Sequence, residues 1–305
     1  MEWANIKYQF TPDFNVRVGR TVLPAFLFAD IRKLGYAHPW LRPPTEIYSL
    51  SALSSSDGVD TSYRLHVGEL TDTIQLSFGN NETKLTGNNG VSDARSIWSI
   101  SNTIEYGPLT TRITYQSADV TATALNALFG AFRQFGPQGV AIADRYNADK
   151  HTSVLGIGAS YDPGDWFVTS EWLQMKTHSI VGKRTSWYVS SGFRFGEFTP
   201  YAMYARAQAD NLSDPGLTLS ALPAFLAGPA TRLNAGLNSG LSRKPVQGTV
   251  SLGARWDFMK NVDLKLQVDH TRIGAGSTGV LINFQPDFQL GGKVNLFSAA
   301  VDFVF

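Results

Sequence analysis

The sequence predicts an all-β protein, a transmembrane antiparallel β-barrel, on three observations. Apolar and polar residues alternate in segments of about ten residues, the length of a tilted strand that crosses a membrane. Short turns alternate with long loops along the chain. Aromatic residues gather near the ends of the alternating segments, as they do at the two interfaces of a membrane barrel.

The composition agrees with this fold class and excludes others. The chain has 305 residues, with 26 Lys and Arg against 25 Asp and Glu, so no bulk charge points to nucleic acid. No run approaches about 18 uninterrupted apolar residues, which excludes a transmembrane helix. Cysteine is absent, which fits an exported protein. The alternative is a soluble β-sandwich, whose strands also alternate but which has no need of aromatic belts at the strand ends.

The alternation predicts about thirteen strands. It is clearest between residues 261 and 272, where apolar residues occupy every second position. The predicted strands lie near residues 2–10, 14–25, 58–68, 72–80, 95–107, 109–119, 151–162, 165–176, 183–195, 198–209, 247–259, 261–272 and 293–305. We treat the whole of 1–305 as one barrel domain.

Two classes of connection alternate between these strands. Short turns contain Pro12, Leu70, Pro108, Pro163, Gly196 and Lys260. Long loops cover 26–57, 81–94, 120–150, 177–182, 210–246 and 273–292. In outer-membrane barrels the short set faces the periplasm. Residues 121–135 have the composition of a short helix over the mouth of the barrel, and residues 221–241 are rich in Ala, Leu, Gly and Pro. Both are candidate gating elements, and the alternative is plain loop packing.

The C-terminus carries a further signal. The chain ends on Val301-Asp302-Phe303-Val304-Phe305, an alternating strand that finishes on phenylalanine. Such an end is typical of the last strand of an outer-membrane barrel, and Phe305 resembles the signal that the barrel-assembly machinery reads. Counting back from Phe305 makes the first and last strands parallel, whereas bacterial barrels are even-stranded. We therefore expect three further strands and a signal peptide before Met1, in a barrel of about 16 strands.

Several segments resemble the Gram-negative trimeric porins. They read EWANIKYQF at 2–10, NVRVGR at 15–20, PPTEIY at 43–48 and SDGVD at 56–60, and the C-terminal strand matches as well. The resemblance implies a homotrimer in the bacterial outer membrane, in contact with lipid and lipopolysaccharide. It also implies passage of small hydrophilic solutes and no cofactor or metal. In such porins a long loop after an early strand folds into the barrel and narrows it.

The alternation places charged residues of both signs in the lumen. The basic set is Lys7, Arg17, Arg64, His66, Arg112, Arg194, Arg206, Arg255 and Lys265. The acidic set is Asp60, Glu105, Glu171, Asp257, Asp263, Asp269 and Asp302. Opposed charges across a water-filled pore orient water and favour small polar solutes. The alternative is that these are ordinary solvated positions stabilised by cross-strand pairs.

Residues 26–57 are the candidate constriction loop. They carry Arg32, Lys33, Arg42 and Glu46, and three prolines stiffen the segment. A mild basic excess at a constriction predicts a weak preference for anions. The alternative is an external loop that packs on its neighbours.

Three functions fit these features. The first is passive diffusion of small hydrophilic solutes. The second is a substrate-specific channel for anionic or aromatic compounds, in which Phe26, Trp40 and Tyr48 form a stacking surface. The third is a non-conducting structural or adhesion barrel. We expect no enzyme, because the sequence has no Gly-x-Ser-x-Gly motif and adjacent strand residues such as Asp269 and His270 point to opposite faces.

Overall fold

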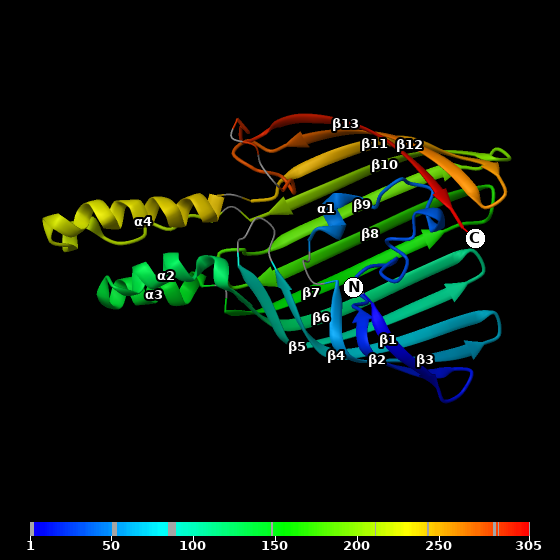
Figure 1. The fold of residues 1–305 in the computed structure, drawn as a ribbon, viewed down its shortest axis with the longest axis horizontal. Coiled ribbons are helices and arrows are strands. Elements are labelled where there is room, and N and C mark those ends of the chain that lie inside the picture. The colour runs from blue at the N-terminus through cyan, green and yellow to red at the C-terminus, as the bar shows by residue number, and fades with distance from the viewer. Residues whose placement is uncertain are drawn as a thin grey trace.

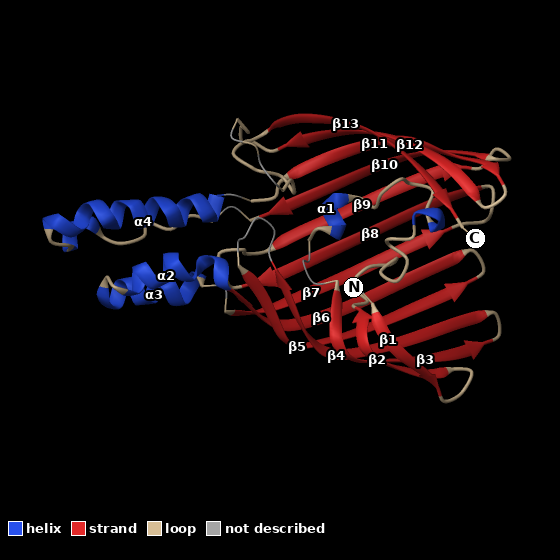
Figure 2. Cartoon of the chain, in the orientation of Figure 1, coloured by secondary structure: helices blue, strands red, loops and turns tan. Residues whose placement is uncertain are grey.

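Thirteen strands form one antiparallel sheet in which every strand pairs with its neighbours in the sequence (Figures 1 and 2). The computed structural model describes residues 3–50, 54–84, 90–147, 149–210, 212–242, 244–282, 285 and 287–304. The predicted all-β antiparallel fold is therefore confirmed. Phe305, Met1 and residues 51–53 of the predicted 26–57 loop lie outside the described residues.

The strands follow the predicted positions closely. They are β1 (Ala4–Gln9), β2 (Phe14–Val22), β3 (Ser55–Val67), β4 (Leu70–Lys84), β5 (Val91–Tyr106), β6 (Leu109–Ala122), β7 (Lys150–Tyr161), β8 (Trp166–Thr177), β9 (Arg184–Phe193), β10 (Phe198–Ala209), β11 (Gln247–Met259), β12 (Val262–Ile273) and β13 (Gly292–Phe303). The observed bounds differ most from the predicted ones where β4 and β5 continue past the apolar belt. In β4 this extension is Asn81-Glu82-Thr83-Lys84, which is polar on both faces, so alternation no longer marks the strand.

The connections at the two ends of the strands differ in length, as predicted. One edge of the sheet carries short turns, and Gly107 and Gly196 enter the left-handed region there with φ of 53° and 60°. The other edge, called here the outer edge, carries the long connections (Figure 1). β1 and β13 are the two ends of the strand order. Among the described residues, no helix combines the length and the apolar character that crossing a membrane requires.

Large apolar side chains cover the outward face of the sheet. Most of the predicted belt is exposed: Tyr8, Phe10, Tyr106, Tyr115, Tyr161, Trp166, Phe193, Phe195, Trp256, Phe258 and Phe303. The prediction was wrong for Tyr201, because its side chain is 5% exposed and points inward. Its hydroxyl donates to the Gln267 Oε1 at 2.7 Å. The remaining belt suits a surface that faces lipid.

The described part of the connection between β2 and β3, residues 23–50 and 54, lies against the inner face of the sheet (Figure 1). We call it the inner loop. It contains the short helices η1 (Gly35–Ala37) and α1 (Thr45–Tyr48). Its apolar side chains, including Phe26 and Ile47, form a buried cluster with Leu173, Tyr188 and Met203 of the wall.

A second set of helices extends beyond the outer edge (Figures 1 and 2). It comprises η2 (Thr123–Leu125), α2 (Asn126–Arg133), α3 (Gly136–Tyr146), η3 (Leu219–Ala221) and α4 (Ala224–Ser242). Together with residues 212–218 we call it the outer helical bundle. Its own buried cluster includes Phe129, Phe132, Ile142, Leu237 and Leu241. The helix predicted within residues 121–135 is therefore present, and residues 224–242 are helical as well, but both project beyond the outer edge instead of covering the mouth.

Candidate functional site

A buried carboxylate on β8 holds the first part of the inner loop. Glu171 is 2% exposed and faces inward. The Leu27 amide donates to its Oε2 at 2.7 Å. The hydroxyls of Tyr48 and Tyr188 donate to its Oε1 at 2.8 and 2.9 Å. One wall residue therefore joins both ends of the inner loop to β8 and β9.

A second carboxylate belongs to the inner loop and binds side chains of the wall. Glu46 of α1 accepts from Gln247 Nε2 at 2.6 Å and from the Thr249 hydroxyl, both on β11. Glu46 was predicted to line the pore, but its side chain is 1% exposed. It anchors α1 to β11 through these two hydrogen bonds.

Near the short-turn edge, buried charges on β11–β13 fix η1. Arg255 pairs with Asp257 at 2.6 Å and with Asp263 at 3.2 Å. It also donates to the Tyr36 carbonyl at 2.7 Å. Lys265 pairs with Asp302 at 3.0 Å. Arg255 thus lies on the inner face as predicted, and these pairs compensate its charge in the way that burial requires.

Two further arginines face inward on the other side of the inner loop. Arg17 of β2 pairs with Asp60 at 2.7 Å and lies 3.7 Å from Asp30 of the loop. Arg112 of β6 donates to the Phe26 carbonyl at 2.8 Å and to the Thr103 hydroxyl at 2.8 Å. Both were predicted on the lumen face and lie there.

The remaining charges of the inner loop gather at one cavity. It has a volume of about 370 Å³ and is lined by Arg32, Lys33, Arg42, Pro43, Thr45, Tyr48 and Ser49. Arg42 also reaches across to Asp269 on β12 at 2.5 Å. The described lining residues include three basic side chains and no acidic one, and the carboxylate of Asp269 lies beside them as the partner of Arg42. Three of the predicted constriction residues are therefore brought together.

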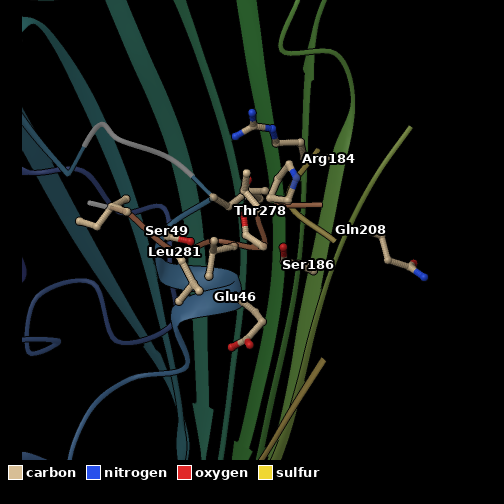
Figure 3. Close-up of a pocket in the computed structure, with 13 residues that line it drawn as sticks. Glu46, Ser49, Arg184, Ser186, Gln208, Thr278 and Leu281 are labelled. Atoms are coloured by element: carbon tan, nitrogen blue, oxygen red, sulfur yellow. Dashed lines mark hydrogen bonds between the residues drawn. The ribbon is translucent and has the colours of Figure 1, made fainter. Parts of the chain in front are cut away.

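A smaller cavity of about 230 Å³ lies between the inner loop and the outer ends of the wall strands (Figure 3). Figure 3 shows Glu46 at one end and Arg184 at the other. Within the described part of the chain, Arg184 Nε and Ser186 Oγ are buried there without a hydrogen-bond partner. Sequence reasoning missed Arg184 because it is the first residue of β9, where alternation has little contrast.

Three predicted lining residues take no part in these contacts and cavities. Arg64 is exposed on β3 near the short turns, at the same parity as the inward-facing Asp60. Arg194 follows β9 and pairs with Asp162 at 2.6 Å, which ties two neighbouring short turns together. Arg206 was placed on the wrong face: the buried residues of β10 are Thr199, Tyr201, Met203, Ala205 and Ala207, so Arg206 points outward. Because the inner loop covers β10, both faces of this strand are apolar and the pattern gave the wrong side.

The predicted stacking surface of Phe26, Trp40 and Tyr48 is not formed as expected. Phe26 and Trp40 are each 2% exposed. Phe26 stacks on Tyr48 with ring centroids 4.5 Å apart, and Trp40 packs edge-on against Tyr188. The rings of Phe26 and Trp40 are therefore buried and not available to a passing solute. The half-buried Tyr48, in contrast, lines the cavity beside Arg32 and Lys33. Among the described residues, no cluster of His, Cys, Asp and Glu is able to hold a metal ion.

Comparisons with known proteins agree with this architecture. A family model described as Gram-negative porin matches residues 49–276. No curated protein matches the sequence. Similar solved structures include OmpF of Salmonella typhi in complex with daunomycin, with 12% identity, TM-score 0.53 and coverage of 98% of this chain and 88% of that one.

Two other solved structures are similar to the same degree. An anion-selective porin from Comamonas acidovorans has 13% identity and TM-score 0.51, covering 95% of this chain and 72% of that one. OmpT of Vibrio cholerae has 11% identity and TM-score 0.51, covering 96% and 78%. At such identities these similarities concern the fold.

Proposed function

This chain belongs to the Gram-negative porin family, and we propose that it forms a channel for passive diffusion of small hydrophilic solutes with a weak preference for anions. Family and fold make it an outer-membrane channel protein. The finer proposal rests chiefly on Arg32 and Lys33 in the cavity that Arg42, the partner of Asp269, also lines. A positive surface beside the path of a solute raises the local concentration of anions.

The arrangement of the other charges supports a weak preference. Most inward-facing charges lie in pairs, such as Arg17 with Asp60 and Lys265 with Asp302. Paired charges orient water and contribute little net potential. The unpaired Nε of Arg184 adds a second positive position towards the outer edge. One of the similar structures is an anion-selective porin, which agrees with the direction of the proposal.

Reversal potential in a salt gradient tests the selectivity. We expect anions to permeate faster than cations, and the double variant Arg32→Gln, Lys33→Gln to bring the permeability ratio to about one. The control is Arg133→Gln, Arg232→Gln, which removes the same charge from the outer helical bundle. Cation preference in the parent protein, or equal shifts in both double variants, would contradict the proposal.

Single-channel conductance separates the remaining alternatives. Passive diffusion gives conductance that rises with salt without saturation. A substrate-specific channel would show block by micromolar solute, and a structural barrel would show no conductance. We also propose a homotrimer with no enzymatic activity. Cross-linking in native membranes tests the trimer, and a monomer as the only species would contradict it.

A further inference from the structure

Two polar side chains at the outer end of β9 line the cavity of about 230 Å³ (Figure 3). Arg184 and Ser186 occupy alternate positions of β9 and both face inward, with their Cα atoms about 7 Å apart. Arg184 Nε and Ser186 Oγ are buried, and neither has a hydrogen-bond partner among the residues that the structure describes. We propose that this cavity, called here the carboxylate cavity, binds a small organic monocarboxylate whose carboxylate group lies at Arg184 and Ser186.

Hydrogen bonds within the protein hold the frame of the carboxylate cavity. Gln247 Oε1 accepts from the Val280 amide at 2.8 Å, and Gln247 Nε2 donates to Glu46 Oε1 at 2.6 Å. The Ser277 hydroxyl accepts from the Gly279 amide at 2.8 Å. Gly279 has φ of 62°, and a Cβ at this position would overlap the Gln247 side chain. The cavity is therefore preformed, which lowers the entropy cost of binding a ligand.

The charges near Arg184 favour an anionic ligand. Lys244 is 4% exposed and donates to the Ile180 and Val181 carbonyls at 3.3 and 3.4 Å. Its charge repels that of Arg184 and is attracted by Asp210, so the one carboxylate offsets only one of the two cations. A buried cation without a counterion is costly, and a carboxylate removes this cost. A carboxylate also matches the planar guanidinium with two parallel hydrogen bonds.

The end of the carboxylate cavity opposite Arg184 restricts the ligand to one negative charge. Glu46 lies there (Figure 3), and its carboxylate repels a second anionic group. The lining also includes the apolar side chains of Leu50, Val280 and Leu281. The volume of about 230 Å³ exceeds the roughly 150 Å³ of a protein cavity that holds benzene. An acid of the size of benzoate therefore fits.

The short helix α1 separates the carboxylate cavity from the cavity on which the proposed selectivity rests. Glu46 lines the first, whereas Thr45 and Tyr48 line the second together with Arg32 and Lys33. The carboxylate cavity is tested by equilibrium binding, which needs no conductance. Its failure would leave the selectivity in a salt gradient unaffected, and a failure of that selectivity would leave the carboxylate cavity standing.

Isothermal titration calorimetry of benzoate with the folded protein in neutral detergent micelles tests the site. Arg184→Gln should weaken binding about 30-fold, because it removes charge-assisted hydrogen bonds, and Ser186→Ala about fivefold. Lys183→Gln is the matched control, because it removes the same charge from the exposed neighbouring residue. Its affinity should stay within about twofold of the parent protein. Unchanged affinity in Arg184→Gln, or an equal loss in Lys183→Gln, would overturn the proposal.

Three analogues test the ligand class on the parent protein. Benzamide has the shape of benzoate without its charge and should bind about 30-fold more weakly. Terephthalate carries a second carboxylate across the ring and should bind about tenfold more weakly because of Glu46. Inorganic phosphate at the same concentration should not displace benzoate. Binding of benzamide or terephthalate as tight as that of benzoate, or displacement by phosphate, would overturn the proposal.

Glu46→Gln tests the restriction to one charge directly. Glutamine keeps an oxygen that accepts from Gln247 and Thr249 but removes the negative charge. Terephthalate should then bind within about threefold of benzoate, and an unchanged difference between the two acids would overturn the assignment to monocarboxylates. If Arg184→Gln does not fold, Ser186→Ala takes its place, since it removes one buried hydroxyl. Unchanged benzoate affinity in Ser186→Ala would then overturn the proposal.

Discussion

The inner loop and the outer helical bundle are both long connections at the outer edge, yet they are stabilised in different ways. The inner loop contributes about half of a buried cluster, and wall strands contribute the rest, including Leu173 and Met203. The cluster of the outer helical bundle is built mainly from its own helices, such as Phe132 of α2 and Leu237 of α4. The first should therefore depend on the barrel wall, and the second should be separable from it.

Polar contacts follow the same division. The inner loop is joined to β8 and β11 by carboxylates whose partners lie far away in the sequence, as in Glu171 with Leu27 and Glu46 with Thr249. The outer helical bundle is held by Asp214, which accepts from Tyr146 and Arg145. A fixed loop can define the width of a channel. A self-contained bundle outside the sheet has little influence on it.

The largest expected effect comes from breaking the anchor of the inner loop. Glu171→Ala removes the shared acceptor of the Leu27 amide and the Tyr48 and Tyr188 hydroxyls. Each orphaned donor costs about 1–3 kcal/mol. We expect the loop to leave the wall, single-channel conductance to rise, and trypsin to cut at Arg32 and Lys33. The outer helical bundle should keep its thermal unfolding.

Glu105→Ala is the control for this change, because Glu105 is an exposed inward carboxyl on β5. Its conductance and proteolysis should match those of the parent protein. Unchanged conductance in Glu171→Ala would show that this carboxylate does not hold the loop in place.

The second prediction concerns the close contact between α2 and α3. A Cβ at Gly139 would overlap the Phe132 carbonyl, whereas a Cβ at Gly130 would have no atom within 4 Å. Gly139→Ala should destabilise the outer helical bundle by about 1–3 kcal/mol. Gly130→Ala should stabilise it by about 0.5–1 kcal/mol, because alanine is the better helix former.

Thermal unfolding of the helical circular dichroism signal measures both glycine variants. The heat resistance of the barrel and its conductance should stay the same in each. If Gly139→Ala also changed conductance, the outer helical bundle would not be separable from the channel, and the contrast between the two regions would be wrong.

The same contrast explains which parts of the fold could be predicted from the sequence. On β11 and β12 one face meets lipid and the other is polar, so alternation gave both the strands and the facing of Arg255 and Lys265. On β10 the inner face belongs to the buried cluster, with Met203 and Ala205 under the inner loop. Both faces of β10 are then apolar. For this reason the period-2 alternation alone placed the side chains of Arg206 and Tyr201 on the wrong faces of the sheet.

Composition gave the charged residues of the inner loop but not their roles. Arg32, Lys33 and Arg42 do line one cavity. Glu46 instead reaches Gln247, which lies 201 residues away in the sequence. A contact over such a separation depends on how the loop docks against the wall, and local patterns contain no information about docking. The distinction between anchoring and exposed charges therefore required the structure.

The smallest expected effect is a pH dependence confined to the outer helical bundle. Burial alone would raise the pKa of Asp214, but hydrogen bonds from the Gly216 amide, Tyr146 and Arg145 hold it below its ordinary value of 3.8. Because the folded state lowers this pKa, the carboxylate contributes stability above that value, and the contribution is lost as pH falls through the folded pKa. The helical signal should therefore unfold at lower temperature below a pH of about 4. Asp214→Asn should be less stable at neutral pH and should lose this part of the acid dependence, and an unchanged acid response in that variant would assign the dependence to another group.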